Sequence, residues 1–342
     1  MPKKAGYNVA VVGAMGLVGT EMIRTLKRRN FPVAEFRPLD VAANEGKEIE
    51  FNGSRYRVLE ARHENFEDID IAIFSAGAEA SRTLAPEAVQ QGAVVVDNSS
   101  QWRMDPECPL VVPEVNPEDV DRHNGIIANP NCSTIQMVVA LKPLHDYGNI
   151  KRVVVSTYQA VSGSGKKAFD GLREESEEYL RTGVPVDPPK AYPTQQIAFN
   201  CLPHIDVFQD GGYTKEEYKM VHETKKILDE EIEVNATCVR VPVWYGHSES
   251  VNVETDKKIT RSKALELLHA AKSIKVIDDP AENRYPTPLM SDDEDLTMVG
   301  RTREDTTIPH GLSLWIVSNN IRKGAALNAV QVAETLIERG KV

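Results

Sequence analysis

The chain has 342 residues, of which 41% are hydrophobic and 27% are charged, and this composition is ordinary for a globular protein. The length is enough for two domains, because single hydrophobic cores rarely grow past about 250–300 residues. Forty Lys and Arg against 51 Asp and Glu give a formal net charge of −11, which argues against sequence-independent binding of nucleic acid. No apolar run approaches the ~20 residues of a transmembrane helix, and no secretory signal core follows Met1. We therefore expect a cytoplasmic protein that does not contact a membrane.

The four cysteines are scattered along the chain without C-x-x-C spacing. This pattern predicts neither a disulfide framework nor a zinc site, and the eight histidines show no H-E-x-x-H spacing. The sequence therefore predicts no metal.

The first third of the chain has the pattern of a dinucleotide-binding fold. An apolar run over 7–12, typical of a buried parallel strand, is followed by Gly13, Gly16 and Gly19 and then by apolar residues at helical spacing. Glycines at such a strand-to-helix turn allow a tight turn and a close approach of the backbone to a pyrophosphate. Further strands are predicted over 33–41, 69–75, 93–97 and 126–128, with a helix over 78–90. This alternation predicts a doubly wound parallel sheet.

Asp40 lies near the end of the second predicted strand, about 20 residues after the glycine turn. A carboxylate at this place can accept hydrogen bonds from the ribose 2′-OH of NAD, and it would repel the 2′-phosphate of NADP. The alternative interpretation is a turn aspartate exposed to solvent.

Cys132 follows a turn-forming run that ends in Pro130 and Asn131, and an apolar helix is predicted over 135–144. The start signals of this helix place the thiol in its first turn, where unpaired N–H groups and the helix dipole favour the thiolate. The alternative is that Cys132 is a small buried hydrophobic residue.

The middle of the chain alternates between strands and polar helices. A strand over 151–161 and a helix over 167–181 flank a glycine-containing turn that lacks Walker spacing, and a Pro-rich surface loop or subunit-contact arm is predicted over 184–193. A charged helix is predicted over 214–230. Strands over 238–244 and 248–256 are predicted to form a hairpin-like pair that presents Arg240 and His247 near one end.

Arg240 and His247 have the chemistry of an active site. An imidazole suits acid–base work near neutral pH, and a guanidinium can bind a carboxylate in bidentate fashion. Either residue alone is more often structural or exposed. The chain ends with a strand over 313–318 and an amphipathic helix over 323–339, which we expect to pack on the nucleotide-binding domain.

Four motifs follow one another in a recognisable order. They are the glycine triplet of 13–19, Pro130–Thr134, Gln159–Gly163, and Arg240–Val243 followed by Gly246–Ser248. Together they resemble the aspartate-β-semialdehyde dehydrogenase family along the whole chain. The resemblance implies a reversible conversion of aspartate semialdehyde, phosphate and NADP+ into 4-aspartyl phosphate and NADPH through a cysteine thioester. It places this reaction in the biosynthesis of lysine, threonine, methionine and diaminopimelate.

The resemblance also implies a domain organisation. An α/β fold is expected, with a Rossmann-type dinucleotide-binding domain made of residues 1–131 and 321–342. Residues 132–320 are expected to form an α+β catalytic and dimerisation domain. The implied assembly is a homodimer, with a tetramer as the alternative.

The resemblance further implies roles for individual residues. Cys132 matches the nucleophile, His247 the acid–base, Gln159 the residue that orients the acyl intermediate, Arg240 the clamp on the substrate carboxylate, and Glu216 a contact to the substrate amino group. The positions that match phosphate-binding residues are Arg103, Asn131 and Lys219. The expected cofactor-binding residues, from the glycine motif and the family together, are Gly13, Met15, Gly16, Leu17, Val18, Gly19, Asp40, Ser162, Gly163 and Asn320.

The segment after the second strand departs from the family pattern. Relatives commonly carry a Ser- and Arg-rich stretch for the 2′-phosphate, whereas residues 39–45 read Leu-Asp-Val-Ala-Ala-Asn-Glu, and no Arg or Lys occurs before Lys47. The resemblance implies NADP, but these residues predict substantial use of NAD.

Three other functions compete with this interpretation. Other phosphorylating semialdehyde enzymes, such as N-acetylglutamyl phosphate reductase or glyceraldehyde-3-phosphate dehydrogenase, share the nucleotide fold and the Cys/His pair, but the motifs around Gln159 and Arg240 favour the aspartyl substrate. A catalytically silent nucleotide-binding relative could have lost Cys132 or His247, and both are present. A metal hydrolase lacks support in the spacing of the histidines.

Overall fold

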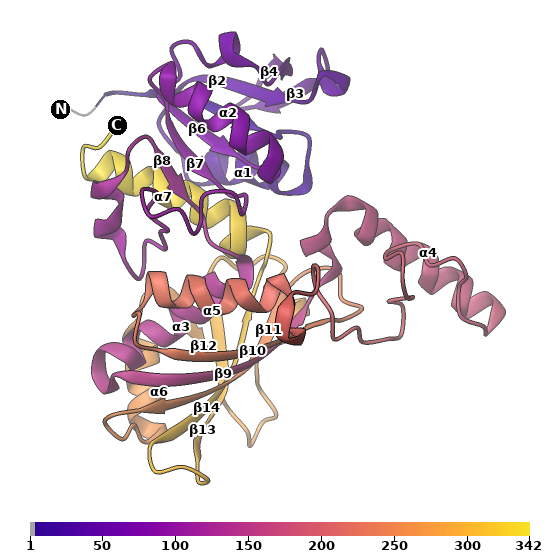
Figure 1. Ribbon diagram of the computed structural model, residues 1–342, viewed down its shortest axis with the longest axis vertical. Coiled ribbons are helices and arrows are strands. Elements are labelled where there is room, and N and C mark those ends of the chain that lie inside the picture. Colours follow the sequence, from indigo (N-terminus) through magenta and orange to yellow (C-terminus); the bar gives the residue numbers. More distant parts are fainter. Residues whose placement is uncertain (1–3) are drawn as a thin grey trace. The chain divides into compact units, whose positions relative to one another are not determined.

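The computed structural model describes residues 4–342 (Figure 1). The chain divides into two compact units. The first unit contains the described residues up to Asn131 together with Ala325–Val342, and the second unit contains Cys132–Gly324. In the described part of the chain, no helix is long and apolar enough to cross a membrane.

A six-stranded parallel sheet forms the centre of the first unit, with the strand order β5-β2-β1-β6-β7-β8. Its strands are β1 (Tyr7–Val12), β2 (Val33–Asp40), β5 (Leu59–Glu60), β6 (Ile71–Phe74), β7 (Val94–Asp97) and β8 (Ile126–Ala128). The short hairpin β3 (Glu48–Phe51) and β4 (Ser54–Arg57), absent from the sequence prediction, follows β2.

Helices cover both faces of this sheet. The central strands are apolar on both sides and send alternate residues into two separate cores. One core contains residues of α1 (Leu17–Arg28) and α7 (Leu327–Glu338), and the other contains residues of α2 (Ala78–Gln90). The first unit is therefore a doubly wound sheet of the Rossmann type, and this part of the fold prediction is confirmed.

The second unit is built on a mixed six-stranded sheet with the order β10-β9-β11-β14-β13-β12. The strands are β9 (Ile150–Gln159), β10 (Glu233–Arg240), β11 (His247–Thr255), β12 (Ile274–Val276), β13 (Thr297–Asp305) and β14 (Gly311–Ser318). The helices are α3 (Cys132–Gly148), α4 (Lys166–Thr182), α5 (Lys215–Ile227) and α6 (Arg261–Ala270). Helices segregated on a mixed sheet make this an α+β unit, as predicted.

The hairpin-like pair predicted for the strands over 238–244 and 248–256 is wrong. β10 and β11 do not pair with each other, because β9 lies between them and pairs with β10 in parallel and with β11 antiparallel. A hairpin is expected from the sequence because the two segments are adjacent along the chain and both alternate between apolar and polar residues. Strand β9, which separates them, comes from much earlier in the chain, so local periodicity could not reveal it.

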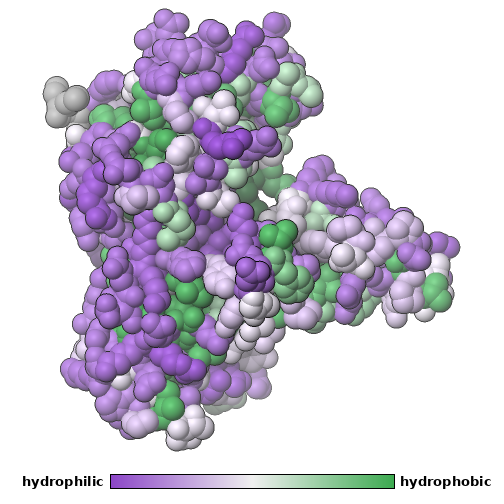
Figure 2. Space-filling model, viewed as in Figure 1, coloured by the Kyte–Doolittle hydropathy of each residue, from purple (hydrophilic) through white to green (hydrophobic). Residues whose placement is uncertain are grey.

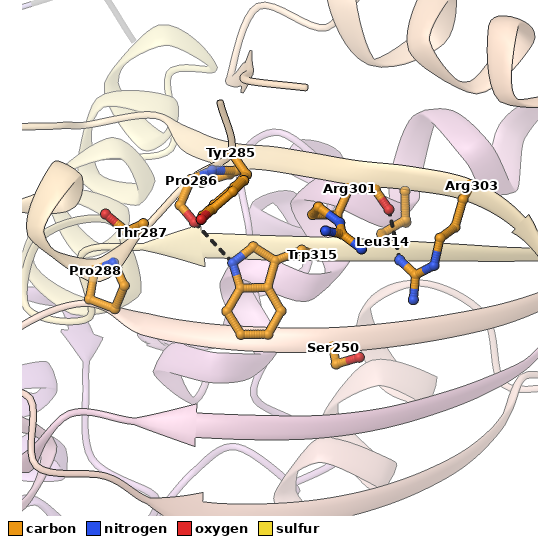
Figure 3. A pocket seen from close by; sticks show the side chains of 9 residues that line it. All are labelled: Ser250, Tyr285, Pro286, Thr287, Pro288, Arg301, Arg303, Leu314 and Trp315. Atoms are coloured by element: carbon orange, nitrogen blue, oxygen red, sulfur yellow. Dashed lines mark hydrogen bonds between the residues drawn. The ribbon is translucent and has the colours of Figure 1, made fainter. Parts of the chain in front are cut away.

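The two faces of the second sheet differ in burial. On β9, Val153, Val155, Thr157 and Gln159 are buried, whereas the intervening residues are exposed or half-buried. The buried face contacts α3, α5 and α6. The open face carries a Tyr158–Trp315 ring pair and a pocket of about 310 Å³ in which Trp315 Nε1 donates to Pro286 O (Figure 3).

Helix α4 projects away from the sheet of the second unit as an arm (Figure 1). The loop over 184–198 folds back on it, because the buried Glu175 carboxylate accepts four backbone N–H groups of that loop. The tip nonetheless exposes Leu180, Val184 and Phe199, and Figure 2 shows isolated apolar side chains among polar ones on this arm.

Candidate active site

The glycine turn of the first unit has room only for glycine at two positions. Gly13 has a φ of 81°, and a Cβ built on it would lie 2.4 Å from the carbonyl oxygen of Ser75. A Cβ on Gly19 would lie 2.1 Å from the carbonyl oxygen of Gly13. The backbone therefore passes close to β6 and to the start of α1, which leaves a cradle of the kind that holds a pyrophosphate.

A pocket of about 520 Å³ opens beside this turn. Its lining includes the predicted residues Gly13, Met15, Gly16 and Asp40, together with Asn44 and Glu60. Asp40 and Glu60 are register partners at the ends of the parallel strands β2 and β5. The chemistry of this pocket fits the ribose end of a dinucleotide, because carboxylate oxygens at the end of the second strand can accept hydrogen bonds from ribose hydroxyls.

Asp40 is buried and also organises the loops around this pocket. Its Oδ2 accepts from Met15 N at 2.8 Å, and its Oδ1 accepts from Val41 N and from Asn44 Nδ2. The alternative of a turn aspartate exposed to solvent is therefore wrong. Glu60 Oε2 lies 3.5 Å from Nη1 of Arg62. The Arg62 side chain is largely exposed and also forms an ion pair with Glu64.

The two predicted phosphate ligands of the first unit are buried. Arg103 donates from Nε to Ser99 O at 3.0 Å and from Nη2 to Asn98 O at 2.9 Å. Asn131 is the last residue of this unit before the chain enters α3.

In the second unit, three predicted residues lie at one end of the sheet. Gln159 and Arg240 end the parallel strands β9 and β10 and are register partners. His247 begins β11, whose next residue pairs with Tyr158 of β9. All three side chains are buried, although an arginine is almost never fully buried unless it is paired.

Gly163 marks the point where Arg240 and His247 come together. A Cβ on Gly163 would lie 3.1 Å from Arg240 Nη1 and 3.4 Å from both Cε1 and Nε2 of His247. Arg240 Nη1 donates to Ala160 O at 2.7 Å, and its guanidinium lies 5.9 Å from the Tyr192 ring centre. Across residues 4–342 no carboxylate is paired with Arg240. A buried guanidinium without an acidic partner is suited to bind a ligand carboxylate.

The hydrogen bonds of His247 define its tautomer. Ala160 N donates to Nδ1 at 3.0 Å, so the neutral ring carries its hydrogen on Nε2. Nε2 is buried and has no hydrogen-bond partner in the described chain. Burial, with the charge of Arg240 nearby, lowers the pKa of His247 well below its usual value. The ring is thus neutral at pH 7 and presents an N–H donor beside Gly163.

Cys132 is the first residue of α3 and is half-buried, so the predicted position in the first turn is confirmed. A Cβ on Gly324 would lie only 2.8 Å from Cys132 Cβ. Gly324 lies in a single π-helical turn, Arg322–Ala326, a form that is frequent at functional sites. Glycine at 324 therefore keeps the space beside the thiol open.

Comparison with known proteins places these two units in one family. The model described as "Semialdehyde dehydrogenase, NAD binding domain" matches residues 8–123, and "Semialdehyde dehydrogenase, dimerisation domain" matches residues 141–323. The aspartate-semialdehyde dehydrogenase of Aquifex aeolicus is 54% identical over 98% of this chain and 100% of its own. The chain belongs to the aspartate-semialdehyde dehydrogenase family. It is therefore an oxidoreductase.

A solved member of the aspartate-semialdehyde dehydrogenase family has the same fold. The enzyme II of Vibrio cholerae, crystallised in complex with ASA, superposes with a TM-score of 0.93 at 47% identity and covers 98% of this chain and 99% of its own. The Campylobacter jejuni relative is 49% identical over 99% of this chain and 99% of its own.

Two further residues predicted from the aspartate-semialdehyde dehydrogenase family form a hydrogen-bonded chain with Gln159. Gln159 Nε2 donates to Glu216 Oε1 at 3.2 Å, and Lys219 Nζ donates to Glu216 Oε2 at 3.0 Å and to Asp206 Oδ2 at 2.8 Å. Burial alone would lower the pKa of Lys219, but the Glu216 and Asp206 carboxylates raise it. Lys219 is therefore a cation held between two carboxylates, and its phosphate role stays a prediction.

The expected cofactor residues of the second unit contact one another. Asn320 Nδ2 donates to Ser162 Oγ at 3.0 Å, and Asn320 Oδ1 accepts from Gly246 N at 3.0 Å. Asn320 thereby ties the turn that contains Gly163 to the turn that precedes His247. This bridging role was not visible in the sequence, because the three segments are far apart along the chain.

Three residues near the candidate site were not identified from the sequence. They are Gly324, beside Cys132, Gln136, which donates to the backbone oxygen of His247, and Glu249, on the strand that begins with His247. A glycine inside a predicted helix was the available signal for Gly324. For Glu249 the signal was strand alternation, since residues 247 and 249 of one strand share a face.

Across residues 4–342, no group of three His, Cys, Asp or Glu side chains is arranged to hold a metal ion.

Proposed function

We propose that this chain catalyses the reversible, phosphate-dependent conversion of aspartate 4-semialdehyde to 4-aspartyl phosphate through a thioester on Cys132. The observation that carries the proposal is a pair of buried side chains, Arg240 and His247. Among residues 4–342, the Arg240 guanidinium has no acidic partner and the Nε2–H of the His247 imidazole has no hydrogen-bond partner. The pair offers one group for a carboxylate and one donor for a developing oxyanion. The reductive direction would supply the biosynthesis of lysine, threonine, methionine and diaminopimelate.

In the oxidative direction, the Cys132 thiolate attacks C4 of the semialdehyde, and the carbonyl π electrons move to oxygen. His247 Nε2–H donates a hydrogen bond to that oxygen, while Arg240 holds the substrate carboxylate and Glu216 its amino group. A nicotinamide cofactor, which the glycine turn would hold, would supply the acceptor for the hydride that leaves C4 as the carbonyl re-forms. The resulting thioester is cleaved when a phosphate oxygen attacks its carbon and the thiolate leaves. We assign phosphate binding to Arg103, Asn131 and Lys219.

The direct test is an assay of phosphate-dependent reduction of NAD+ or NADP+ with aspartate semialdehyde, monitored at the nicotinamide absorbance. We expect turnover that disappears without phosphate. N-acetylglutamate semialdehyde and glyceraldehyde 3-phosphate serve as competing substrates. If either of these gave the higher kcat/KM, the assignment to the aspartyl substrate would be wrong.

Replacing Arg240 with lysine should raise KM for aspartate semialdehyde by about 10- to 100-fold, because a point charge loses the bidentate geometry and its associated hydrogen bond. The change in kcat should be smaller than the change in KM. Steady-state kinetics measure KM and kcat for aspartate semialdehyde. The control is Arg173→Lys, on the exposed face of α4. An unchanged KM would remove Arg240 from substrate binding.

We further propose that the enzyme uses NAD at a substantial rate. The pocket beside the glycine turn carries Asp40 and Glu60, and no Lys or Arg of the described chain belongs to its lining. These carboxylates would repel a 2′-phosphate and can accept from a 2′-OH. The glycine cradle fits either dinucleotide, so the discrimination depends on this end of the pocket.

The cofactor prediction is tested by kcat/KM for NADPH and NADH. More than about a hundredfold preference for NADPH would contradict it, since that equals about 2.7 kcal/mol in favour of the 2′-phosphate.

Asp40→Ser should raise the ratio of kcat/KM for NADPH to that for NADH about tenfold, by removal of one charge-assisted hydrogen bond. The ratio is the useful quantity, because loss of the bond to Met15 N will weaken both cofactors. Glu45→Ser, at an exposed residue of the same segment, should leave the ratio unchanged.

A homodimer is the assembly we propose for the second unit. The family model that matches residues 141–323 is described as a dimerisation domain. The open face of the sheet offers Tyr158, 36% exposed, together with Trp315 and the adjacent pocket (Figure 3). Aromatic side chains on a partly exposed sheet face are typical of protein interfaces.

A further inference from the structure

Glu249 is a buried carboxyl group that the proposed reaction does not use. It is the third residue of β11, on the same face of the strand as His247, and it is completely buried. Its register partners are Thr157 on β9 and Ile316 on β14, neither of which carries a charge. A carboxylate in such surroundings needs a compensating partner or a proton.

The oxygen atoms around Glu249 lack donors. Both carboxyl oxygens of Glu249 and the Oε1 of Gln136 are buried and without a hydrogen-bond partner among the described residues. Gln136 is the neighbouring side chain that acts on the protonation of the Glu249 carboxyl. These three oxygen atoms therefore have no hydrogen to accept from the described residues, although buried polar atoms are almost always satisfied. One proton on Glu249 corrects this, because the O–H can then donate to Gln136 Oε1.

Gln136 links this carboxyl group to the reactive residues. It lies one helical turn after Cys132 on α3, and therefore on the same side of the helix. Its Nε2 donates to the backbone oxygen of His247 at 3.4 Å. Gln136 thus contacts the strand that carries His247 from the helix that begins with Cys132.

We propose that Glu249 is a positioning residue, held as a neutral carboxylic acid whose O–H donates to Gln136 and so fixes the start of α3 against the start of β11. The inference rests on the proposed function, because it assigns a reason for holding the Cys132 helix and the His247 strand in one arrangement. Small misplacements of reacting groups reduce rates strongly, and about 1 Å can lower a rate about a hundredfold.

The surroundings of Glu249 favour the neutral form. Burial raises the pKa of Glu249 well above its usual value, and Gln136 opposes this only in part. The titratable side chains near it are His247 on the same strand and Cys238 on β10, with Glu216 and Glu217 of α5 beyond Cys238. Burial keeps His247 neutral, and burial together with these carboxylates raises the pKa of Cys238, so neither supplies a charge opposite Glu249 at pH 7.

A neutral Glu249 predicts a pH-dependent difference between wild type and Glu249→Gln. The folded state binds a proton that the unfolded state releases above the usual Glu pKa, so the wild type loses stability as pH rises from that value toward the raised folded value. Glu249→Gln has no such proton. Its unfolding equilibrium constant, relative to wild type, should fall by up to about tenfold per pH unit over this window. Denaturant unfolding between pH 5 and pH 8 measures this ratio.

The positioning role is tested by comparing Glu249→Gln with Glu249→Leu. Glutamine retains a donor for Gln136 and should keep kcat within about threefold of wild type, with an unchanged pH profile. Leucine removes the donor and should lower kcat by at least about tenfold while KM changes less. Glu254→Leu, on the opposite face of the same strand, is the control and should leave kcat unchanged.

A second readout does not depend on the substrate. The rate of alkylation of Cys132 by iodoacetamide, followed by peptide mass spectrometry, should be changed in Glu249→Leu and unchanged in Glu249→Gln. Equal loss of kcat in both variants, or an acidic limb that shifts in Glu249→Gln, would show that the charge is needed and would overturn the proposal. Full activity in Glu249→Leu would overturn it as well. A wild type that is inactive with aspartate semialdehyde would instead overturn the proposed function, and the stability and alkylation results would still decide the state of Glu249.

Discussion

Cys132→Ser should lower kcat/KM for aspartate semialdehyde by at least about 10⁴-fold. Removing a catalytic nucleophile typically costs a rate factor of this order or more. A serine hydroxyl at the first residue of α3 has almost no alkoxide at neutral pH, whereas the same helix start stabilises a thiolate. The space left open beside it by Gly324 accommodates the slightly smaller oxygen, so the fold should be kept.

The assay for Cys132→Ser is phosphate-dependent reduction of the nicotinamide, with thermal unfolding as a check that the variant is folded. Cys201→Ser is a matched control, because Cys201 is exposed and lies outside the candidate site. We expect the control to retain wild-type kinetics. A Cys132→Ser variant with turnover within tenfold of wild type would exclude a thioester on this residue.

His247→Asn is expected to reduce kcat by about 10²–10⁴-fold, the usual contribution of a positioned acid or base. The asparagine side chain is shorter, so it cannot both accept from Ala160 N and place a donor where Nε2–H lies beside Gly163. The loss should appear in kcat more than in KM, because the N–H acts on charge that develops during reaction.

The measurement for His247→Asn is the full pH profile of kcat, with His269→Asn as the control at an exposed position of α6. Since the pKa of His247 is lowered well below its usual value, the wild-type profile should show no fall in kcat that originates from this ring between pH 6 and pH 8. A loss smaller than threefold in His247→Asn would remove the imidazole from the reaction.

Local sequence patterns were sufficient where short-range physics decides the structure. The apolar run before Gly13, the glycine turn and the following amphipathic helix specify their own conformation, so the strand–turn–helix unit was predicted correctly. The same holds for Cys132, because a turn-forming run before an apolar helical pattern can start a helix at few positions.

Long-range pairing could not be read from the sequence. The order β10-β9-β11 places Gln159 between Arg240 and His247, and no local signal distinguishes this order from a hairpin of adjacent strands. The strands β12 and β13 and the helix α6 were also missed, because their weak periodicity becomes ordered only against neighbouring elements. The neutral environment of Glu249 is likewise a product of packing.

The sequence by itself determined which chemical groups this protein has: a helix-start thiol, an imidazole, a guanidinium and a glycine turn followed by a segment poor in basic residues. Only the tertiary structure decided how they are used. Burial removes water from Arg240 and His247, sets the ring hydrogen on Nε2 through Ala160 N, and leaves Asp40 to accept from the glycine loop. The physical reason is that desolvation and hydrogen-bond geometry depend on neighbours that are distant in sequence, whereas residue identity and local periodicity do not.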